Sequence, residues 1–419
     1  MKNLFLLFAA TGLLMASCTQ NETDGFNSQN PDAIKFSAAT SRASISNLAT
    51  LEGDSDGFTV YGISQGASAW YTNIDGNNNY RYSSGSWGWA GTAAKWPTSA
   101  ADYPMVFYAV YPQSSSGVMT VTATDPATSP LTGTVTIPSA ASLQRDILAA
   151  KATATAKPAG GILPLTFKHI LSKVNFGIIA GDGFTVNIQK ASVVNAKMTG
   201  TYDFVAEGWS TPTGPRTFDY FKNTSANFTT TGTSSEDTAV PFYTGNHGYH
   251  LMLMPQTTSA WDKTISGLTY GAYIEVIYRI KNASGDYIGY EDANNFLSDH
   301  SESYTDGSNT WGSPLYTGIA TGNNPYGSNP LYVRVGFPLE ITWVPGKGYT
   351  YNICLGTAGS TNGYYVDETY YDKDGTDTGI QILGPDDKPV KPGDPIMDGT
   401  INFLVKVTEW DDQAATAVQ

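Results

Sequence analysis

The chain has 419 residues, which is long enough for two or three domains with sizeable cores. It carries 23 basic and 37 acidic side chains, and a net charge of −14 argues against a nucleic-acid partner because phosphate backbones repel such a surface. Charged residues make up only 14% of the chain, whereas glycine and tyrosine number 43 and 26. This composition is typical of β-strands joined by turns, with a polar but weakly charged exterior.

Residues 1–17 have the pattern of a secretory signal peptide, with Lys2 before an apolar run from Leu4 to Met15. The run is too short to span a bilayer. The small residues directly before Cys18 resemble the lipobox of bacterial lipoproteins, in which the cysteine is acylated and becomes the new N-terminus. We therefore predict a lipid such as palmitate on Cys18. The alternative is a signal peptide cut elsewhere, which leaves this thiol unmodified.

Residues 18–33 are polar and without periodicity, which indicates a tether. From residue 34 onward, short runs of alternating apolar residues separated by turn formers predict strands. The clearest runs are 34–38, 58–63, 105–111, 118–123, 132–138, 173–179, 184–188, 249–255, 272–280, 349–355 and 400–408. Residues 140–154 have apolar residues near helical spacing, and predict a short helix between Pro138 and Pro158.

The many short strands predict an all-β fold of two β-sandwich domains, transthyretin-like or immunoglobulin-like Greek keys, with one or two short helices. We place an N-terminal sandwich at 34–183 and a C-terminal one at 184–419, with a long polar insertion near 283–330. Loops of that length are usually functional or mobile. With Cys18 lipidated, Cys354 has no partner for an intrachain disulfide, and we expect it to be a buried apolar residue.

Sequence motifs for catalysis or for a cofactor are sparse. The four histidines, His169, His247, His250 and His300, lack the i, i+4 spacing of a zinc protease. The sequence has no nucleophile elbow and no phosphate-binding loop. We therefore predict no enzymatic activity and no cofactor.

Three aspartates, Asp372, Asp374 and Asp377, surround Gly375 and form a weak candidate for a Ca²⁺ site. Their spacing does not match an EF-hand loop, which ends in a glutamate. Aspartate and glycine are also ordinary residues of hairpin turns, and we favour a turn without metal.

Four tryptophans, Trp70, Trp87, Trp89 and Trp96, lie in an otherwise polar stretch. Exposed aromatic faces stack on sugar rings, so a glycan site that includes Trp87 or Trp89 is one interpretation. The favoured interpretation is that these rings fill the core or one end of a sandwich.

Several segments, taken in order, resemble the fimbrillin family, the subunits of type V pili in anaerobic oral and gut bacteria. They are "IKFSAATSRAS" (34–44), "MVFYAVYP" (105–112), "LQRDILAAKA" (143–152), "GGILPLTFKHILSKVNFGI" (160–178), "WVPGKGYTYNICL" (343–355) and "INFLVKVTEW" (401–410). The resemblance runs nearly the length of the mature chain. It implies two β-sandwich domains, export to the outer membrane as a lipoprotein, and a role at the cell surface in pilus assembly and adhesion.

The resemblance also implies how such a subunit matures. In the family, a protease with arginine preference cuts after the first strand, and a strand of the next subunit fills the apolar groove that is left. Arg42 matches the cleavage arginine. The displaced strand would carry Ile34, Phe36 and Ala38 on one face by period-two alternation. The partners would then be other pilus subunits; the alternative is that the strand is retained, as in anchor-type members.

The C-terminal strand leaves two roles open. If Ile401, Phe403, Val405 and Val407 point inward as the domain's own last strand, the chain accepts a strand but donates none, as a tip subunit would. If the strand swings out, the chain is a shaft subunit. We favour the tip. Two other functions stay open: a monomeric surface lipoprotein that binds glycans, and a glycosidase, whose paired carboxylates the sequence does not reveal.

Overall fold

The computed structural model describes most of the predicted strands. The described residues are 32–40, 57–71, 79–83, 86–113, 117–126, 131–180, 185–222, 228–231, 240–241, 250–263, 271–281, 304–306, 309–311, 332–355, 363–372, 375–382, 389–396 and 403–409. Their regular structure is almost entirely β, which confirms the all-β prediction. The described helical elements are short 3₁₀ turns: η2 (Ala100–Asp102), η4 (Ala141–Leu143) and η5 (Ala159–Gly161). No helix in these ranges is long and apolar enough to cross a membrane.

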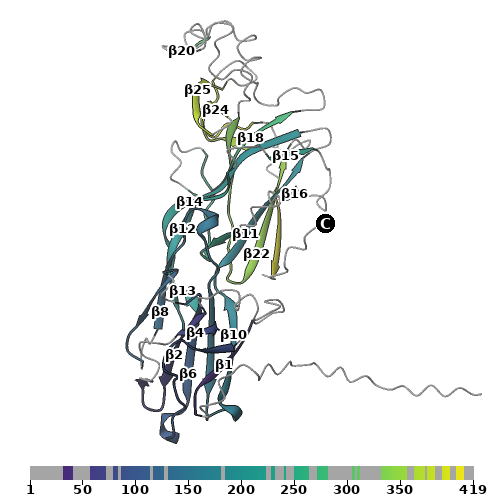
Figure 1. Ribbon diagram of the computed structural model, residues 1–419. Coiled ribbons are helices and arrows are strands. Elements are labelled where there is room, and N and C mark those ends of the chain that lie inside the picture. The colour runs from purple at the N-terminus through teal and green to yellow at the C-terminus, as the bar shows by residue number, and fades with distance from the viewer. Residues whose placement is uncertain are drawn as a thin grey trace, which may run out of the picture.

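An eight-stranded sheet forms the N-terminal half of the molecule, at the bottom of Figure 1. Its strands, in spatial order, are β1 (Lys35–Thr40), β10 (Ile162–His169), β9 (Leu148–Ala154), β6 (Met105–Tyr111), β2 (Phe58–Ser64), β4 (Asn79–Ser83) and β5 (Ser86–Trp89), and β3 (Ala69–Trp70) pairs with β2. The two ends of the sheet meet, because Trp89 on β5 hydrogen-bonds the backbone next to β1. The sheet therefore curls around its own core.

The C-terminal half is a sandwich of two sheets. The larger one has nine strands: β23 (Tyr364–Tyr365), β21 (Val333–Pro338), β18 (Tyr273–Lys281), β12 (Thr185–Asp203), β8 (Leu131–Thr136) and β7 (Met119–Ala123), with β13 (Gly208–Trp209), β14 (Thr213–Lys222) and β15 (Phe228–Thr231) also on β12. The smaller one has β16 (Val240–Pro241), β11 (Ser172–Ala180), β22 (Lys347–Leu355) and β26 (Phe403–Glu409), with β17 (Leu251–Leu253) on β11. Apolar residues of both sheets share one buried core.

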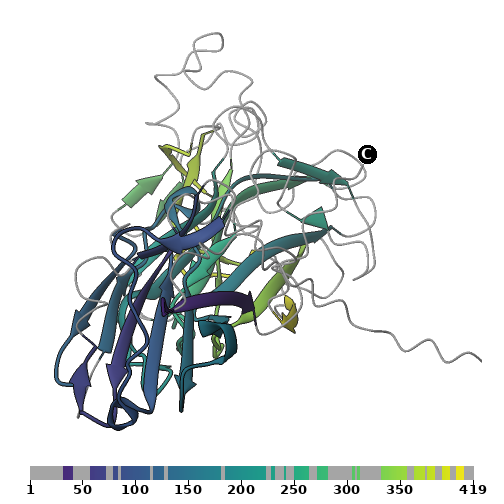
Figure 2. The same cartoon turned by 60° about the horizontal axis from the view of Figure 1, so that its bottom comes forward.

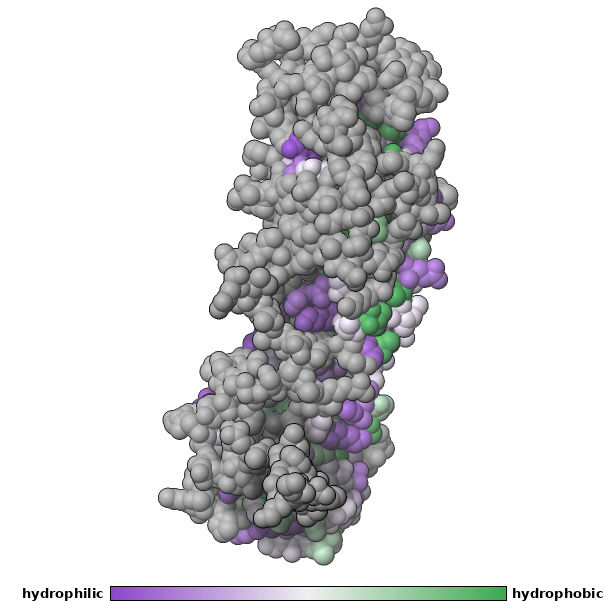
Figure 3. Space-filling model, turned by 90° about the vertical axis from the view of Figure 1, so that its right-hand side faces the viewer, coloured by the Kyte–Doolittle hydropathy of each residue, from purple (hydrophilic) through white to green (hydrophobic). Residues whose placement is uncertain are grey.

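Two hairpins lie outside these sheets. One joins β19 (Tyr304–Asp306) to β20 (Asn309–Trp311), and the other joins β24 (Thr369–Tyr371) to β25 (Asp377–Gln381). Figure 1 shows both hairpins toward the top of an elongated molecule, at the end opposite to β1. On the face in Figure 3, the described residues show hydrophobic and hydrophilic colour in small neighbouring patches rather than one large apolar area.

The sheets do not divide where we placed the domain boundary. The chain leaves the N-terminal sheet after β10 and enters the five-stranded sheet with β11, before residue 183. The hairpin of β7 and β8 lies within 34–183, yet it pairs with β12 in the nine-stranded sheet. Strand pairing over such separations depends on tertiary contacts that single runs of residues do not encode.

The predicted helix at 140–154 is wrong. Residues 141–143 form the turn η4, and residues 148–154 form β9 between β6 and β10. Alanine-rich segments favour helices when isolated, but the backbone ladders on both sides of β9 override that weak preference.

Buried tyrosines make the fold sensitive to alkali. Burial raises the pKa of Tyr220 to about 12, although a backbone hydrogen bond lowers it slightly. Burial also raises the pKa of several other tyrosines above the usual value, namely Tyr80, Tyr202, Tyr273, Tyr278, Tyr351 and Tyr365.

We expect the free energy of unfolding to fall as pH rises above about 10, because the unfolded chain then loses tyrosine protons that the folded chain keeps. Urea titrations at pH values between 8 and about 12, with tyrosinate absorbance as a second probe, measure this. Tyrosinate that appears near pH 10 while the far-UV spectrum stays native would contradict it.

Candidate functional site

Strand β1 lies at the edge of the N-terminal sheet and has an unusual pairing. It runs parallel to β10, whereas the other pairs in this sheet are antiparallel. The register places Phe36 opposite Leu163, Ala38 opposite Leu165 and Thr40 opposite Phe167. Figure 2, turned so that the bottom comes forward, shows β1 as the darkest purple arrow at the front. One strand thus completes this edge of the sheet.

The side chains of β1 fill the middle of the N-terminal core. Ile34, just before the strand, is fully buried, and Phe36 is 1% exposed. The Phe36 ring makes edge contacts with four aromatic rings: Phe58 at 6.5 Å, Tyr80 at 5.4 Å, Trp89 at 5.7 Å and Phe107 at 5.6 Å between ring centroids. Edge-to-face pairs at these distances are favourable beyond the burial of their area.

Residues 34–36 also make hydrogen bonds to groups outside β10. Ile34 N–H donates to the Ala94 carbonyl at 2.8 Å, and Trp89 Nε1–H donates to the Ile34 carbonyl at 2.8 Å. The Phe36 N–H donates to the Tyr80 hydroxyl at 3.4 Å. Burial raises the pKa of Tyr80 above its usual value, so its hydroxyl stays neutral at any physiological pH. Two side chains and the Ala94 carbonyl therefore provide bonds here in place of a neighbouring strand.

The described residues include only part of the predicted maturation site. Ile34 and Phe36 are both buried, as the alternation predicted, and the backbone of Ala38 is in register with Leu165. Arg42 and Cys18 lie outside the described residues. The strand ends at Thr40, so Arg42 follows it by two residues in the sequence.

The C-terminal strand β26 pairs with a strand of its own chain. It runs antiparallel to β22, with Phe403 opposite Ile353, Val405 opposite Tyr351 and Val407 opposite Tyr349. Val407 is 52% exposed, so the prediction that it points inward is wrong. Val407 lies two residues before the end of β26, which is the edge strand of the five-stranded sheet, so neighbouring strands cover it from one side only. Ile401 lies outside the described residues.

The aspartates of the weak Ca²⁺ candidate hold a hairpin turn. The Asp372 carboxylate accepts from Thr376 N–H at 2.8 Å, and the Asp377 carboxylate accepts from Gly379 N–H at 2.8 Å. Such bonds are typical of turns. Asp374 is not among the described residues, and within the described part of the chain no group of three potential ligands gathers as a metal site would.

The tryptophans and histidines have structural surroundings. Trp87 and Trp96 are buried in the N-terminal core and are 8% and 4% exposed, so they do not offer a face to a sugar. Trp89 is partly buried against the same core. His169 Nδ1 lies 2.6 Å from the Asp146 carboxylate. Cys354 is buried in β22, as expected.

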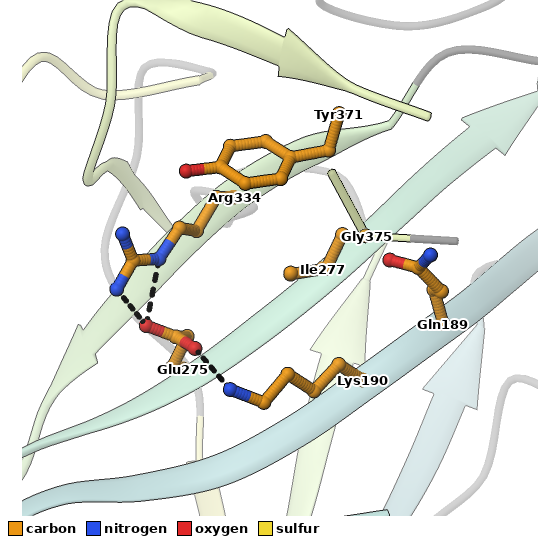
Figure 4. Close-up of a pocket in the computed structure, with 7 residues that line it drawn as sticks. All are labelled: Gln189, Lys190, Glu275, Ile277, Arg334, Tyr371 and Gly375. Atoms are coloured by element: carbon orange, nitrogen blue, oxygen red, sulfur yellow. Dashed lines mark hydrogen bonds and ion pairs between the residues drawn. The ribbon is translucent and has the colours of Figure 1, made fainter. Parts of the chain in front are cut away.

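A second polar cluster, which sequence reasoning missed, lies under the β24–β25 hairpin (Figure 4). Glu275, on β18, is 1% exposed. Its carboxylate lies 2.5 Å from an Arg334 nitrogen and 3.2 Å from Lys190 Nζ. Burial is the largest single influence on the pKa of Arg334 and lowers it, but the charge and hydrogen bond of Glu275 together with two nearby tyrosines raise it, and the net shift is upward. The one signal in the sequence is a glutamate in the middle of the apolar strand "AYIEVIYRI".

Individual solved structures resemble this chain only weakly. A candidate cell adhesion protein of Bacteroides uniformis matches with 15% identity and a TM-score of 0.36, over 90% of this chain and 97% of that one. A candidate cell adhesion protein of Parabacteroides distasonis matches with 14% identity and a TM-score of 0.38, over 91% of this chain and 96% of that one. Among curated proteins, none is similar enough to count as a match. The model of one family, described as fimbrillin-like, matches residues 41–366, which is most of the chain, and the protein therefore belongs to the fimbrillin-like family.

Proposed function

We propose that this protein is a pilus subunit that reaches the outer membrane as a lipoprotein and is then activated by proteolysis after Arg42. The cut would remove β1 together with the lipid on Cys18. The same event would release the subunit from the membrane and open a groove for a strand of another subunit. Membership in the fimbrillin-like family gives the chain a fimbrial or adhesive role rather than an enzymatic one.

The observation that carries this proposal is the way β1 is held at the edge of the N-terminal sheet. The strand is at a sheet edge, is continuous with a short arginine-containing segment, and fills the aromatic core through Phe36. Removing Ile34 and Phe36 would uncover apolar surface worth about 1.5–3 kcal/mol for each side chain. An open edge and an empty core position are what a strand from a partner completes. In this proposal, the groove that β1 leaves is what a strand of another subunit fills.

The pairing of β26 with β22 supports a tip role over a shaft role. Seven backbone positions of β26, from Phe403 to Glu409, stand in register with β22 of the same chain. A strand held in this way completes its own sheet and is not free to enter a neighbour. The tip role places any adhesive surface on this chain at the end of a pilus.

Limited trypsin digestion tests the proposal. We expect a new N-terminus at Ala43, loss of the segment that carries β1, and ladders of polymers or capped complexes on gels when a donor-competent subunit is present. A synthetic peptide of residues 33–41 should block this assembly by occupying the groove that β1 leaves. Because Phe36 supplies the four ring contacts, the same peptide with Phe36→Ala should block at least tenfold less well, since each 1.4 kcal/mol is a factor of ten.

The matched control is Arg42→Ala, which should resist trypsin at this position and stay monomeric. A cut chain that keeps residues 34–40 bound and never assembles would contradict the proposal. So would assembly that proceeds unchanged in the Arg42→Ala chain.

A further inference from the structure

The β4–β5 hairpin brings two polar side-chain groups to the backbone of residues 34–36. Tyr80 on β4 and Trp89 on β5 stand opposite each other in the hairpin, and their rings meet edge to face with 5.4 Å between centroids. The Trp89 Nε1–H donates to the Ile34 carbonyl, and the Tyr80 hydroxyl accepts from the Phe36 N–H. Strands far from β1 in the order of the sheet thus contact the segment that closes it.

Two groups outside β10 hold the backbone of Ile34. The Ile34 N–H donates to the Ala94 carbonyl, and the Ile34 carbonyl accepts from Trp89 Nε1–H, each at 2.8 Å. We call the two groups the backbone clamp. Neither bond involves a side chain of the strand, so the clamp accepts any residue that has an N–H, which excludes only proline. Ala94 is fully buried and Trp89 partly buried, so both groups lose a partner in a poorly solvated place if the strand leaves.

The pocket around Phe36 contacts a side chain rather than the backbone. Its walls are the rings of Phe58, Tyr80, Trp89 and Phe107, and each meets the Phe36 ring at an interplanar angle between 66° and 87°. These edge-to-face contacts require a ring at this position, which leucine lacks. Tyrosine has the ring but adds a hydroxyl where Phe36 is only 1% exposed, and a buried hydroxyl without a partner is unfavourable. The pocket therefore fits phenylalanine better than either.

We propose that the groove left by β1 selects its partner strand by these two features. The partner strand carries an aliphatic residue in the fully buried position of Ile34 and a phenylalanine two residues later, in the position of Phe36. The backbone clamp holds the first residue, which makes Trp89 a positioning residue for the incoming strand, and the pocket takes the phenylalanine. The clamp acts on every strand alike, so the choice between strands lies in the pocket. This inference rests on the proposed exchange of strands.

Peptides of residues 33–41 test the pocket on the chain that has been cut after Arg42 and freed of the segment that carries β1. Isothermal titration calorimetry measures their dissociation constants. We expect the Phe36→Leu and Phe36→Tyr peptides to bind about tenfold more weakly than the unchanged peptide. The matched control is the Lys35→Leu peptide, because Lys35 is the half-buried neighbour and should change the affinity by no more than about twofold.

Backbone variants of the same peptide test the clamp without any change in the protein. N-methylation of Ile34 removes the N–H that the Ala94 carbonyl accepts, and should weaken binding about tenfold. The control is N-methylation of Ala38, which lies on the same edge of the strand by period-two alternation. Among the described residues Ala38 makes no backbone bond of this kind, so its N-methylation should cost far less.

Replacement of Trp89 by 3-benzothienylalanine keeps a bicyclic ring and puts sulfur in place of Nε1–H. We expect the unchanged peptide and the Phe36→Leu peptide to lose affinity by the same factor, about three- to tenfold, because the lost bond is to the backbone. If Trp89 served only as a wall of the pocket, the preference for phenylalanine over leucine would change instead. The same replacement at Trp87, in the same strand and core, is the matched control and should leave both affinities within about twofold.

The intact, uncut chain gives a second measurement, because β1 itself occupies the groove there. Phe36→Leu and Phe36→Tyr should each lower the urea midpoint of unfolding relative to the wild type, and Lys35→Leu should not. A Phe36→Leu chain as stable as the wild type overturns the role of the pocket. A cut chain that never releases β1 overturns the proposed exchange, and this inference with it.

Three results overturn the inference alone. They are a leucine or tyrosine peptide that binds as tightly as the unchanged one, an N-methyl-Ile34 peptide that does so, and a Trp89 replacement that leaves the affinity unchanged or alters only the preference for phenylalanine. Peptide binding with the expected preferences, but without assembly when a donor-competent subunit is present, overturns only the assembly proposal.

Discussion

Replacing Phe36 by alanine is expected to destabilise the N-terminal half by about 3–5 kcal/mol, the usual cost of truncating a buried phenylalanine. The ring is 1% exposed and contacts Phe58, Tyr80, Trp89 and Phe107, so its loss leaves a cavity lined by rigid aromatic groups that collapse poorly. Urea unfolding followed by tryptophan fluorescence includes this half, because Trp87 and Trp96 lie in the same core, while Trp261 and Trp343 report on the C-terminal half.

Lys35→Ala is the matched control, since Lys35 is the neighbouring residue on β1 and is only half-buried. Surface changes of this kind usually shift the free energy of unfolding by less than about 0.5 kcal/mol. A loss below about 1 kcal/mol for Phe36→Ala would mean that the core does not depend on β1. The proposal that its removal opens a costly groove would then fail as well.

Short apolar runs bounded by turn formers predicted most of the strands, including β2 and β6, which are buried on both faces. They placed Ile34 and Phe36 together, and they also found β22 and β26. They failed at 148–154, where alanine suits either structure and the neighbours β6 and β10 decide. The sequence pattern could not predict which sheet the β7–β8 hairpin joins, because the pairing of β8 with β12 is a long-range contact.

The candidate site was predictable in its apolar part only. Phe36 was visible in the sequence as an alternating residue before Arg42. Tyr80 and Trp89, which bond the same segment, are 44 and 55 residues away from their partners and have no local signature. The ion pairs of Glu275 were equally hidden, because Lys190 and Arg334 lie on separate strands that only the folded sheet brings together.

Arg334→Met is expected to destabilise the C-terminal sandwich by about 3 kcal/mol, the lower end of the range for breaking a buried ion pair. The Glu275 side chain is 2% exposed, and it would keep only Lys190 as a cationic partner. An uncompensated carboxylate in a poorly solvated site is costly unless it takes up a proton. Urea unfolding of the variant and the wild type at pH 7 measures the loss.

The double variant Glu275→Leu with Arg334→Met separates the charge from the packing. It removes both ends of the pair and leaves Lys190 bonded to Asp219, so no buried charge is stranded. We expect it to be more stable than Arg334→Met alone, because apolar replacements of a whole buried pair are often neutral or better. A double-mutant cycle from urea unfolding at pH 7 gives the coupling, and additive losses would show that Glu275 and Arg334 stabilise the sheet independently. A double variant that is more stable than the wild type would show that the ion pair is kept at a cost in stability.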